Sequence, residues 1–505
     1  MNRRGFIQIS SVAILPILLG VFPKSTERKK YTIKVQSNRA FGHLLRTTSA
    51  VLPTSETITD YIIVGGGVAG ISAAHALKNE KFILFEGSQR LGGSSASESW
   101  KDTRFSMGAH YELAYPNYFG TEVIDLLQQL NVIKYNSSSE LFEFVDKEYV
   151  IEPNELEQCF HQNEVFKDVL SDAKGADDFY KCLEPFEGTM TLPTRLINED
   201  YHYLNDITFK DYLESKMELS EDLELRISYQ MIDDWGGKCD EISALAGIHY
   251  YTCRPYNTKE IELFSAPFGN SYFIEKMLGD IPNLDSLKTD SMVRKINVFD
   301  HGVEAEILNK NGDVELVKAK GLIYAGQKHA LKYILESEVN LFDTNYAPWV
   351  VLNIVCRKGV KFEKWQNDVL TNELNFLGFV NSSKQTTRSK DYDTFTAYYC
   401  FSSEEKELLV DIEKNPDNFV ESTLSLIEEK TGTFVTEFVD HVNVNLMAHA
   451  MPISKPDYLT FSDVPQYKER VVFAGVDTGR LPLFFEACDS GLQAGQRIVN
   501  NCKKI

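Results

Sequence analysis

The sequence is short of basic residues, and this scarcity excludes one class of partner. Its 505 residues include 52 lysines and arginines against 73 aspartates and glutamates, which gives a formal net charge of -21. Proteins that bind nucleic acid need a basic face for the phosphate backbone. Nucleic acid is therefore not an expected partner, and the acidic balance is typical of a well-solvated surface.

Clustered cysteines are missing too. None of the eight cysteines stands in a CxxC unit, so the spacing that zinc, cluster and dithiol redox sites require is absent. We expect no metal site, and we expect the cysteines to be small buried side chains. Spacing alone cannot say whether any of them pair in an exported protein. The hydrophobic content of 43% allows a sizeable core, and the length suits roughly two or three ordinary domains or one large two-domain enzyme.

An uninterrupted apolar run of about 20 residues, which a membrane-spanning helix needs, is lacking as well. The nearest approach is residues 1–22, in which Arg3 and Arg4 precede an apolar run interrupted by polar residues and a proline. This is the layout of a bacterial export signal, and it resembles the twin-arginine motif. We expect export by the twin-arginine machinery to the periplasm or the outer face of the inner membrane. No clear cleavage site follows Phe22, so the segment is either cut elsewhere or kept as a membrane anchor.

What is present is a glycine-rich turn between an expected strand and an expected helix. The β-branched run 61–64 predicts a buried parallel strand, and the alanine-rich stretch 71–77 predicts a packed helix. Between them Gly65, Gly67 and Gly70 form a GxGxxG turn. The first glycine permits the tight turn, the second lets backbone N–H groups approach a pyrophosphate, and the third lets helix and strand pack closely. The helix N-terminus, with Val68 and Ala69, attracts the negative charge.

An acidic residue ends the next expected strand, residues 82–85. Glu86 stands sixteen residues after Gly70, where its carboxylate can accept both ribose hydroxyls of an adenosine. Glycine-rich turns alone are frequent. This one follows a strand, opens a helix and precedes the acid, which is the context that the dinucleotide-binding motif demands. The sequence therefore predicts dinucleotide binding.

The residues after Glu86 indicate which dinucleotide is expected. Residues 86–94 read EGSQRLGGS and resemble the E-x-x-x-R-x-G-G stretch of the flavin amine oxidases and their relatives. The resemblance implies FAD as cofactor, with the glycine pair passing under its pyrophosphate. It adds five expected cofactor contacts: Gly87, Arg90, Gly92, Gly93 and Ser94. The family usually continues with arginine after the glycine pair, so the serine of this chain is a departure.

The far end of the chain resembles the second half of the same site. Residues 470–499 contain a strand-like run and then a helical pattern, as in the C-terminal FAD motif of that superfamily. In this motif the helix N-terminus points at the flavin ring, where it stabilises the negative charge of the reduced flavin. The resemblance assigns five more cofactor contacts: Gly475, Asp477, Ser490, Gly491 and Leu492.

The positions of these motifs imply a domain organisation. An α/β, Rossmann-like FAD-binding domain of the GR2 type is expected from three segments: 58–115, 265–330 and 465–505. In the second of them, the resemblance implies that the backbone of Val293 touches adenine. The intervening segments are expected to form an inserted α+β substrate-binding domain: 116–264 and 331–464. Residues 23–57 are expected to be a linker or an arm that lies on the enzyme.

One candidate for chemistry near the flavin is His110. Residues 105–111 resemble the segment that runs past the flavin ring, where Gly108 and Ala109 allow close backbone approach. His110 can bond the substrate or the flavin, or serve as a base. A single histidine is more often a structural hydrogen-bonding group, and this alternative stays open.

A second candidate is an acidic pair beside aromatic side chains. Asp233 and Asp234 precede Trp235, and Tyr251 follows downstream. These acids can hold a cationic amine near Trp235 or Tyr251, and Tyr251 is also a candidate catalytic residue. Adjacent carboxylates more often cap a helix or face water. Amine oxidases commonly place a tyrosine just before the C-terminal helix, whereas this chain has Leu481-Pro-Leu-Phe-Phe485 there.

Three hypotheses follow for a small-molecule substrate or ligand. The first is an exported FAD-dependent oxidoreductase that oxidises a C–N bond of an amine or polyamine, or a C–C bond, by hydride transfer to the flavin. The second is a desaturase or isomerase of the same fold that acts on an apolar molecule. The third is a non-catalytic FAD-binding envelope protein. An acidic pocket favours the first hypothesis, and an apolar pocket favours the second.

Overall fold

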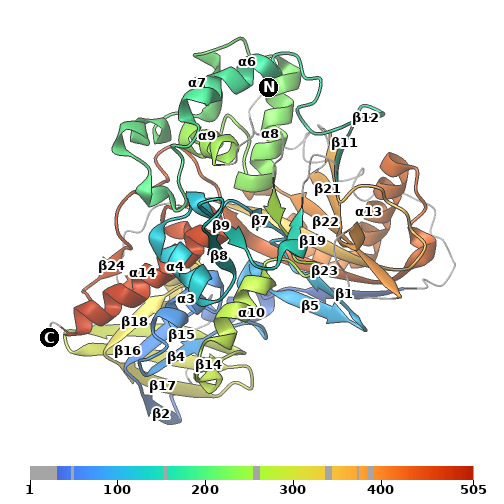
Figure 1. Cartoon of the computed structure of the whole chain (residues 1–505). Coiled ribbons are helices and arrows are strands. Elements are labelled where there is room, and N and C mark those ends of the chain that lie inside the picture. Colours follow the sequence, from blue (N-terminus) through green and yellow to red (C-terminus); the bar gives the residue numbers. More distant parts are fainter. Residues whose placement is uncertain are drawn as a thin grey trace, which may run out of the picture.

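The computed structural model describes residues 31–46, 51–151, 156–253, 262–335, 344–371, 375–384 and 391–503. The expected export signal lies outside these residues. Within them, no helix combines the length and the apolar character needed to cross a membrane. Figure 1 shows one α/β body, a large sheet beside it and a helical layer at the top.

A six-stranded sheet forms the centre of the α/β body. Its strands come from three distant parts of the chain, in the order β14 (Leu287–Lys288), β4 (Phe82–Phe85), β3 (Tyr61–Val64), β18 (Gly321–Tyr324), β25 (Val471–Phe473) and β24 (Gln466–Tyr467). All neighbours are parallel except β24, which pairs antiparallel with β25. Ile62 and Ile63 are both fully buried, because a parallel sheet is covered on both faces.

Each face of this sheet has its own cover. Three helices pack on one side: α3 (Val68–Ala76), α10 (Ser271–Gly279) and α14 (Phe484–Lys503). A four-stranded sheet covers the other side: β15 (Ser291–Phe299), β16 (Gly302–Asn309), β17 (Val314–Ala319) and β2 (Ser55–Ile58). The short helix α11 (Leu331–Ile334) packs with this second layer. The predicted Rossmann-like domain is therefore present, assembled from the segments in which its motifs stand.

The second large element is an eight-stranded sheet. Its order is β1 (Thr32–Gln36), β23 (Val439–Pro452), β19 (Tyr346–Arg357), β22 (Tyr392–Cys400), β21 (Phe376–Asn381), β20 (Gln366–Leu370), β11 (Glu157–His161) and β12 (Glu164–Phe166). Two helices cover one face, α12 (Leu408–Lys414) and α13 (Pro416–Thr431). A helical layer packs over part of the other: α6 (Ala176–Leu183), α7 (Phe209–Glu214), α8 (Glu221–Trp235) and α9 (Ala244–Thr252).

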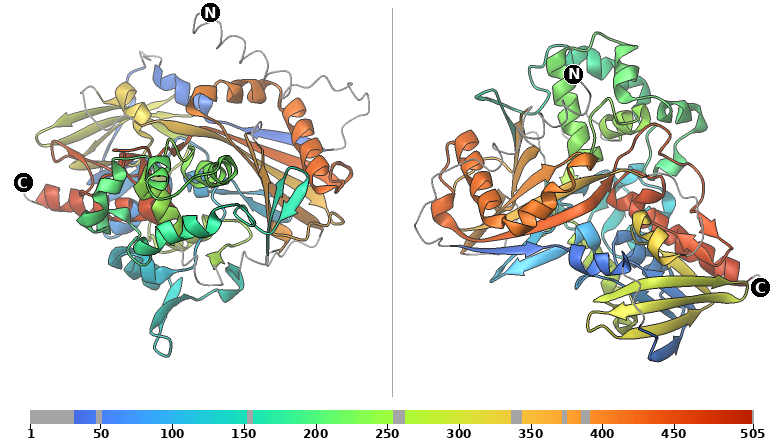
Figure 2. Two further views of the ribbon diagram at one scale, coloured as in Figure 1. Left: turned by 90° about the horizontal axis from the view of Figure 1, so that it is seen from above. Right: turned by 180° about the vertical axis from the view of Figure 1, so that it is seen from behind.

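Part of the expected arm belongs to this sheet. Strand β1 pairs in parallel with β23, in a register that sets Thr32 opposite His441. Figure 2 shows this blue strand beside the orange strands of the sheet. The side chains of Ile33 and Val35 pack against the core beneath α13. Residues 32–36 are therefore an edge strand.

One segment expected to bind substrate packs on the nucleotide side instead. Helix α4 (Thr121–Gln129) buries Val123 and Leu126 against α3 and α14, in one cluster with Phe485. The hairpin β8 (Ile133–Asn136) and β9 (Leu141–Phe144) follows it. The substrate-binding segment was expected to begin at residue 116, and this boundary is wrong for α4. The apolar face of α4 packs against α3 and α14, which its own sequence pattern could not indicate.

Short strands join the two parts. A hairpin of β5 (Ser97–Trp100) and β6 (Thr103–Ser106) leads toward His110. A three-stranded sheet then connects β7 (Glu112–Leu113), β13 (Leu263–Phe264) and β10 (Val150–Ile151). These strands hold residues 107–113 between the nucleotide-binding body and the large sheet.

Candidate functional site

The GxGxxG turn has the geometry that its glycines predict. Gly65 has a φ of +98°, and an added Cβ would lie 2.7 Å from the carbonyl oxygen of Ala325. A Cβ on Gly70 would lie 1.8 Å from the oxygen of Gly65. A Cβ on Gly67 meets nothing within 4 Å. Packing therefore demands Gly65 and Gly70, whereas Gly67 faces open space at the N-terminus of α3.

Glu86 is fixed at the rim of this turn. Its Oε2 accepts a hydrogen bond from the Gly66 N–H at 2.6 Å, and its Oε1 accepts one from the Ser88 N–H at 2.7 Å. The backbone oxygen of Glu86 accepts from the Ser291 N–H at 2.9 Å. This bond draws the start of β15, with Val293, to the end of β4. Glu86 and Val293, the two residues expected at the adenosine, are thus brought close to each other although they belong to different layers.

The second glycine pair runs against the first turn. The Gly92 N–H donates to the oxygen of Gly66 at 2.7 Å, and both Gly92 and Gly93 have positive φ, at 111° and 58°. Arg90 turns the other way. Its guanidinium donates to Gln36 Oε1 at 2.7 Å and pairs with Glu98. Arg90 was predicted to contact the cofactor, whereas in the structure its guanidinium bonds Gln36 of the arm. Gly87 lies on the same side, where an added Cβ would be 3.9 Å from Phe41.

Ser94 brings the segment around His110 to the glycine turns. Its carbonyl oxygen accepts a hydrogen bond from the Ala109 N–H at 2.9 Å. A Cβ on Gly108 would lie 2.6 Å from the same oxygen. Glycine at position 108 is what permits this close approach.

The two predicted ends of the cofactor site meet in space. A Cβ on Gly491 would lie 2.1 Å from the oxygen of Ala69, so α14 crosses α3 at backbone contact. Leu492 is buried in the cluster that includes Val68. Gly475 donates its N–H to Ser490 Oγ at 3.0 Å. Residues more than 400 positions apart in the sequence therefore build one corner.

The carboxylate of Asp477 is buried and accepts hydrogen bonds from two residues of the protein. Its Oδ2 accepts from the Lys328 N–H at 2.7 Å and from the Tyr346 hydroxyl at 2.6 Å. Burial raises the pKa of Asp477, and these two donors act in the opposite direction. The carboxyl thereby fixes the loop after β25 to β19 of the large sheet.

A cavity of about 260 Å³ joins the predicted cofactor and substrate residues. From the cofactor set it is lined by Val68, Ser94, Gly108 and Ala109. From the substrate set it is lined by Asp233, Asp234 and Trp235. The N-terminal end of α14 closes one side, where Leu483 and Phe484 form the wall in place of the tyrosine of the family pattern.

Two further carboxyls, which the sequence did not single out, line the same cavity: Glu112 and Asp368. Asp368 on β20 is buried, and its Oδ1 accepts hydrogen bonds from the Tyr229 hydroxyl and from Gln366 Nε2, both at 3.1 Å. Burial raises the pKa of Asp368 to about 7, and the negative charge of Asp234 acts in the same direction. The cavity therefore has an acidic end beneath α8.

His110 lies where the cavity meets the large sheet. Its Nδ1 is 3.2 Å from the Tyr398 hydroxyl, and its Nε2 is 3.4 Å from Ser382 Oγ. Tyr398 also donates to the oxygen of Gly108 at 3.4 Å. Burial raises the pKa of Tyr398, so this hydroxyl keeps its proton. A histidine with a hydroxyl at each ring nitrogen is oriented and can pass a proton.

Tyr251, the second candidate catalytic residue, is not among the residues that line the cavity. Its ring packs among Phe179, Phe209 and Tyr250 in the core of the helical layer, and its hydroxyl bonds Gln230. Tyr250 lines the cavity instead. One step along a helix rotates a side chain by about 100°, which the sequence pattern did not resolve.

The fold and the site define an α/β protein with a Rossmann-like dinucleotide-binding domain and a cavity under a second domain. Residues 63–130 match the family of NAD(P)-binding Rossmann-like domains. No curated protein sequence matches the chain. The predicted fold class is confirmed.

Solved structures make the likeness more specific. A cyclohexylamine oxidase from Brevibacterium oxydans IH-35A aligns with a TM-score of 0.61 at 14% identity, over 88% of this chain and 99% of that one. A putrescine oxidase bound to putrescine aligns with 0.60 at 14%, over 88% and 100%. A structure assigned to protoporphyrinogen oxidase from Exiguobacterium sp. 255-15 aligns with 0.59 at 13%, over 90% and 100%. The resemblance to the flavin amine oxidases thus holds at the level of the fold.

Proposed function

We propose that this protein is an FAD-dependent oxidoreductase that oxidises the C–N bond of a cationic amine. The observation that carries this proposal is the shared cavity, which runs from Val68 at the N-terminus of α3 to the acidic end at Asp368. A cofactor held at the glycine turns would face a substrate held at the acids. The fold that the chain shares with two amine oxidases supports the same conclusion.

The residues present fit FAD. Gly67 faces open space at a helix N-terminus, where backbone N–H groups can bind a pyrophosphate. Both oxygens of Glu86 are already oriented by backbone N–H groups and keep lone pairs for ribose hydroxyls. Gly92, Gly93 and the 108–109 segment would flank the rest of the cofactor. FAD, when bound, would supply the hydride acceptor.

The acidic end supports a cation as substrate. Asp233, Asp234 and Asp368 are three of the four carboxyls that line the cavity, whose aromatic wall includes Trp349 and Tyr398. Carboxylates bind ammonium groups by charge-assisted hydrogen bonds, and aromatic faces attract cations. An amine or diamine would be held at this end, with its reacting C–N bond directed toward Gly108 and His110. His110 would orient the substrate and exchange a proton through Tyr398 or Ser382.

An apolar substrate is the second candidate. Leu377, Phe379, Leu483 and Phe484 give the cavity apolar walls, and one structure of the same fold is assigned to protoporphyrinogen oxidase. The carboxyls that line the same cavity disfavour this candidate, because an apolar ligand would remove their remaining water and offer no compensating charge.

We also propose export by the twin-arginine route. The support is the paired Arg3 and Arg4 before an apolar run. This route carries folded proteins, so FAD could be loaded before export.

The test is spectroscopic. The purified protein should be yellow, and its band at about 450 nm should bleach under anaerobic conditions with an amine. The panel contains mono-, di- and polyamines, amino acids and polyenes. Asp368→Asn and Asp233→Asn should weaken amine binding by about tenfold or more, whereas Asp240→Asn, an exposed position after the same helix, should not.

Each outcome has one meaning. Bleaching by amines that is lost in the Asp368 variant supports the proposal. Bleaching by polyenes alone supports the apolar candidate. A yellow protein that no substrate reduces supports a non-catalytic flavin-binding protein. A folded protein that does not bind FAD overturns all three hypotheses.

A further inference from the structure

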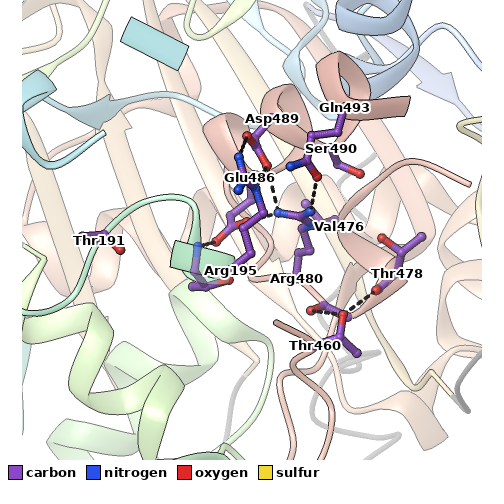
Figure 3. Close-up of polar contacts among 12 residues, drawn as sticks. Thr191, Arg195, Thr460, Val476, Thr478, Arg480, Glu486, Asp489, Ser490 and Gln493 are labelled. Carbon is purple, nitrogen blue, oxygen red and sulfur yellow. Dashed lines mark hydrogen bonds and ion pairs between the residues drawn. The ribbon is translucent and has the colours of Figure 1, made fainter. Parts of the chain in front are cut away.

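Four charged side chains form a buried ion-pair quartet between α14 and residues 194–195 (Figure 3). The quartet consists of Arg195, Arg480, Glu486 and Asp489. The Arg195 guanidinium binds both oxygens of Asp489, at 2.9 and 3.0 Å. Arg480 Nη1 lies 3.0 Å from Asp489 Oδ2 and 3.5 Å from Glu486 Oε2. The two acids are fully buried, and Arg480 is almost fully buried.

Neutral groups complete the bonding of the quartet. The Thr194 N–H donates to Glu486 Oε1 at 2.6 Å, and Arg480 Nη2 donates to Gln493 Oε1 at 2.9 Å. At the solvent edge, Glu122 of α4 lies 3.4 Å from Arg195. The quartet therefore ties the loop before residue 198 to the first turns of α14.

The quartet lies behind the wall of the cavity. Phe484 and Ala487, in the first turn of α14, line the cavity. Glu486 and Asp489 lie in the first two turns of the same helix. Their side chains accept hydrogen bonds from Thr194 and Arg480, respectively, and do not line the cavity. Two negative charges thus stand within one or two helical turns of the surface expected to face the flavin ring.

The balance of charges in the quartet determines the electrostatic field that the N-terminus of α14 exerts on the cavity. A helix N-terminus carries partial positive charge, which would stabilise the negative charge of a reduced flavin. Two buried carboxylates in the first turns oppose that effect. Arg195 and Arg480 bring the formal charge of the quartet to zero, so the field of the backbone remains. Burial raises the pKa of Glu486, and the positive charge of Arg480 acts against this rise.

We propose that Arg480 is a positioning residue that compensates the charge of Glu486 and Asp489 and thereby keeps the N-terminus of α14 electropositive toward the flavin. The inference rests on the proposed function. Arg480 itself does not line the cavity, so it acts through α14.

The experiment compares the midpoint potential of bound flavin in two variants of opposite charge. Arg480→Gln leaves excess negative charge and should shift the potential to more negative values. Glu486→Gln leaves excess positive charge and should shift it to more positive values. Both variants lose one partner of the same quartet, so a merely structural role would not give opposite signs. Potentials are measured from pH 6 to 9, because the pKa of Glu486 is raised by burial.

Two controls separate charge from geometry. Arg480→Lys keeps the charge and loses the planar fork, so the potential should stay near the native value. Arg497→Gln removes an arginine from the far end of the same helix. The ion-pair partner of Arg497, Asp463, is exposed, so this variant should leave the midpoint potential unchanged. Shifts of the same sign in Arg480→Gln and Glu486→Gln, or no shift in either, overturn the proposal.

A readout that needs no flavin keeps the two proposals distinguishable. Amide hydrogen exchange at residues 194–197 and 484–490 should increase in Arg480→Gln and stay native in Arg497→Gln. If the protein binds no FAD, the proposed function fails and the charge effect on flavin fails with it. The exchange data then still decide whether Arg480 positions α14, and unchanged exchange overturns that part.

Discussion

The Tyr229 hydroxyl donates a hydrogen bond to Asp368 Oδ1 at 3.1 Å, and this bond spans from α8 to β20 at the acidic end of the cavity. Both side chains are buried. The same hydroxyl also lies within hydrogen-bonding distance of the Leu377 oxygen. Burial raises the pKa of this carboxyl to about 7, whereas the hydrogen bond that orients it acts in the opposite direction.

The first prediction concerns stability against pH. The Asp368 carboxyl has a higher pKa in the folded chain than in the unfolded one, so its ionisation opposes folding increasingly as pH rises from about 4 to 7. Asp368→Asn removes this penalty. We expect the variant to gain about 2 kcal/mol more in unfolding free energy at pH 8 than at pH 5. Urea unfolding at both values measures it, and a gain that is larger at pH 5 would contradict the burial argument.

The second prediction is that Asp368→Asn, although more stable, binds amines more weakly than the native protein. Only the ionised carboxylate of Asp368 attracts an ammonium group, so amine binding by the native protein should strengthen as pH rises through about 7. Asp368→Asn should bind weakly and lose this pH dependence. Stability gained at the expense of binding is the expected sign of a functional buried charge. Titration with an amine inhibitor at several pH values tests it.

Two glycine variants separate packing from cofactor binding. Gly491→Ala places a methyl group 2.1 Å from the Ala69 oxygen and should cost roughly 1–3 kcal/mol of stability. Gly67→Ala meets nothing within 4 Å and should unfold at the native denaturant concentration. It should nevertheless lose at least about tenfold in FAD affinity, because its methyl group takes the space of the pyrophosphate. Native FAD affinity in Gly67→Ala would contradict the site.

A fourth prediction addresses His110 and its hydroxyl partners. We expect His110→Gln to lower kcat about 100-fold while FAD stays bound, which is within the usual contribution of a proton-transferring group. Tyr398→Phe should shift the pH profile of kcat, since it removes the hydroxyl at Nδ1. His301→Gln, exposed on the nucleotide side, is the control. If kcat of His110→Gln stays within a few-fold while stability falls, His110 is only structural.

The cysteines give a fifth prediction. All eight lie among the described residues and carry thiols rather than disulfides, and six of them are buried. Thiol titration of the denatured protein should therefore count eight thiols. A reductant should leave the melting temperature unchanged, because no cross-link constrains the unfolded chain. A count below eight in protein isolated from its native compartment would reveal pairing there.

The nucleotide corner was predictable because its constraints are local. Gly65, Gly67 and Gly70 act within one turn, and each has a conformational reason that the residue type alone expresses. Glu86 follows at a spacing that one helix and one strand determine. The far end at Gly475 and Gly491 followed from a motif of the same kind. Such signals survive without knowledge of the rest of the chain.

The acidic end and the quartet were not predictable in this way. Asp368 faces the cavity because of the register of β20 in an eight-stranded sheet, and register depends on pairing with distant strands. Arg195 meets Asp489 across 294 residues of sequence. Tyr250 and Tyr251 differ only in the direction of a side chain on α9. No local pattern distinguishes such residues from ordinary core or surface positions.

Strand β1 has a further consequence for how the molecule is completed. Thr32 bonds His441 across 409 residues of sequence. Strand β1 can therefore pair only after β23 is in place. Closing so long a loop is entropically costly and slow compared with forming a helix or a hairpin. The edge of the large sheet should therefore form at the end of folding. A fluorophore near Thr32 would report when this strand pairs with β23.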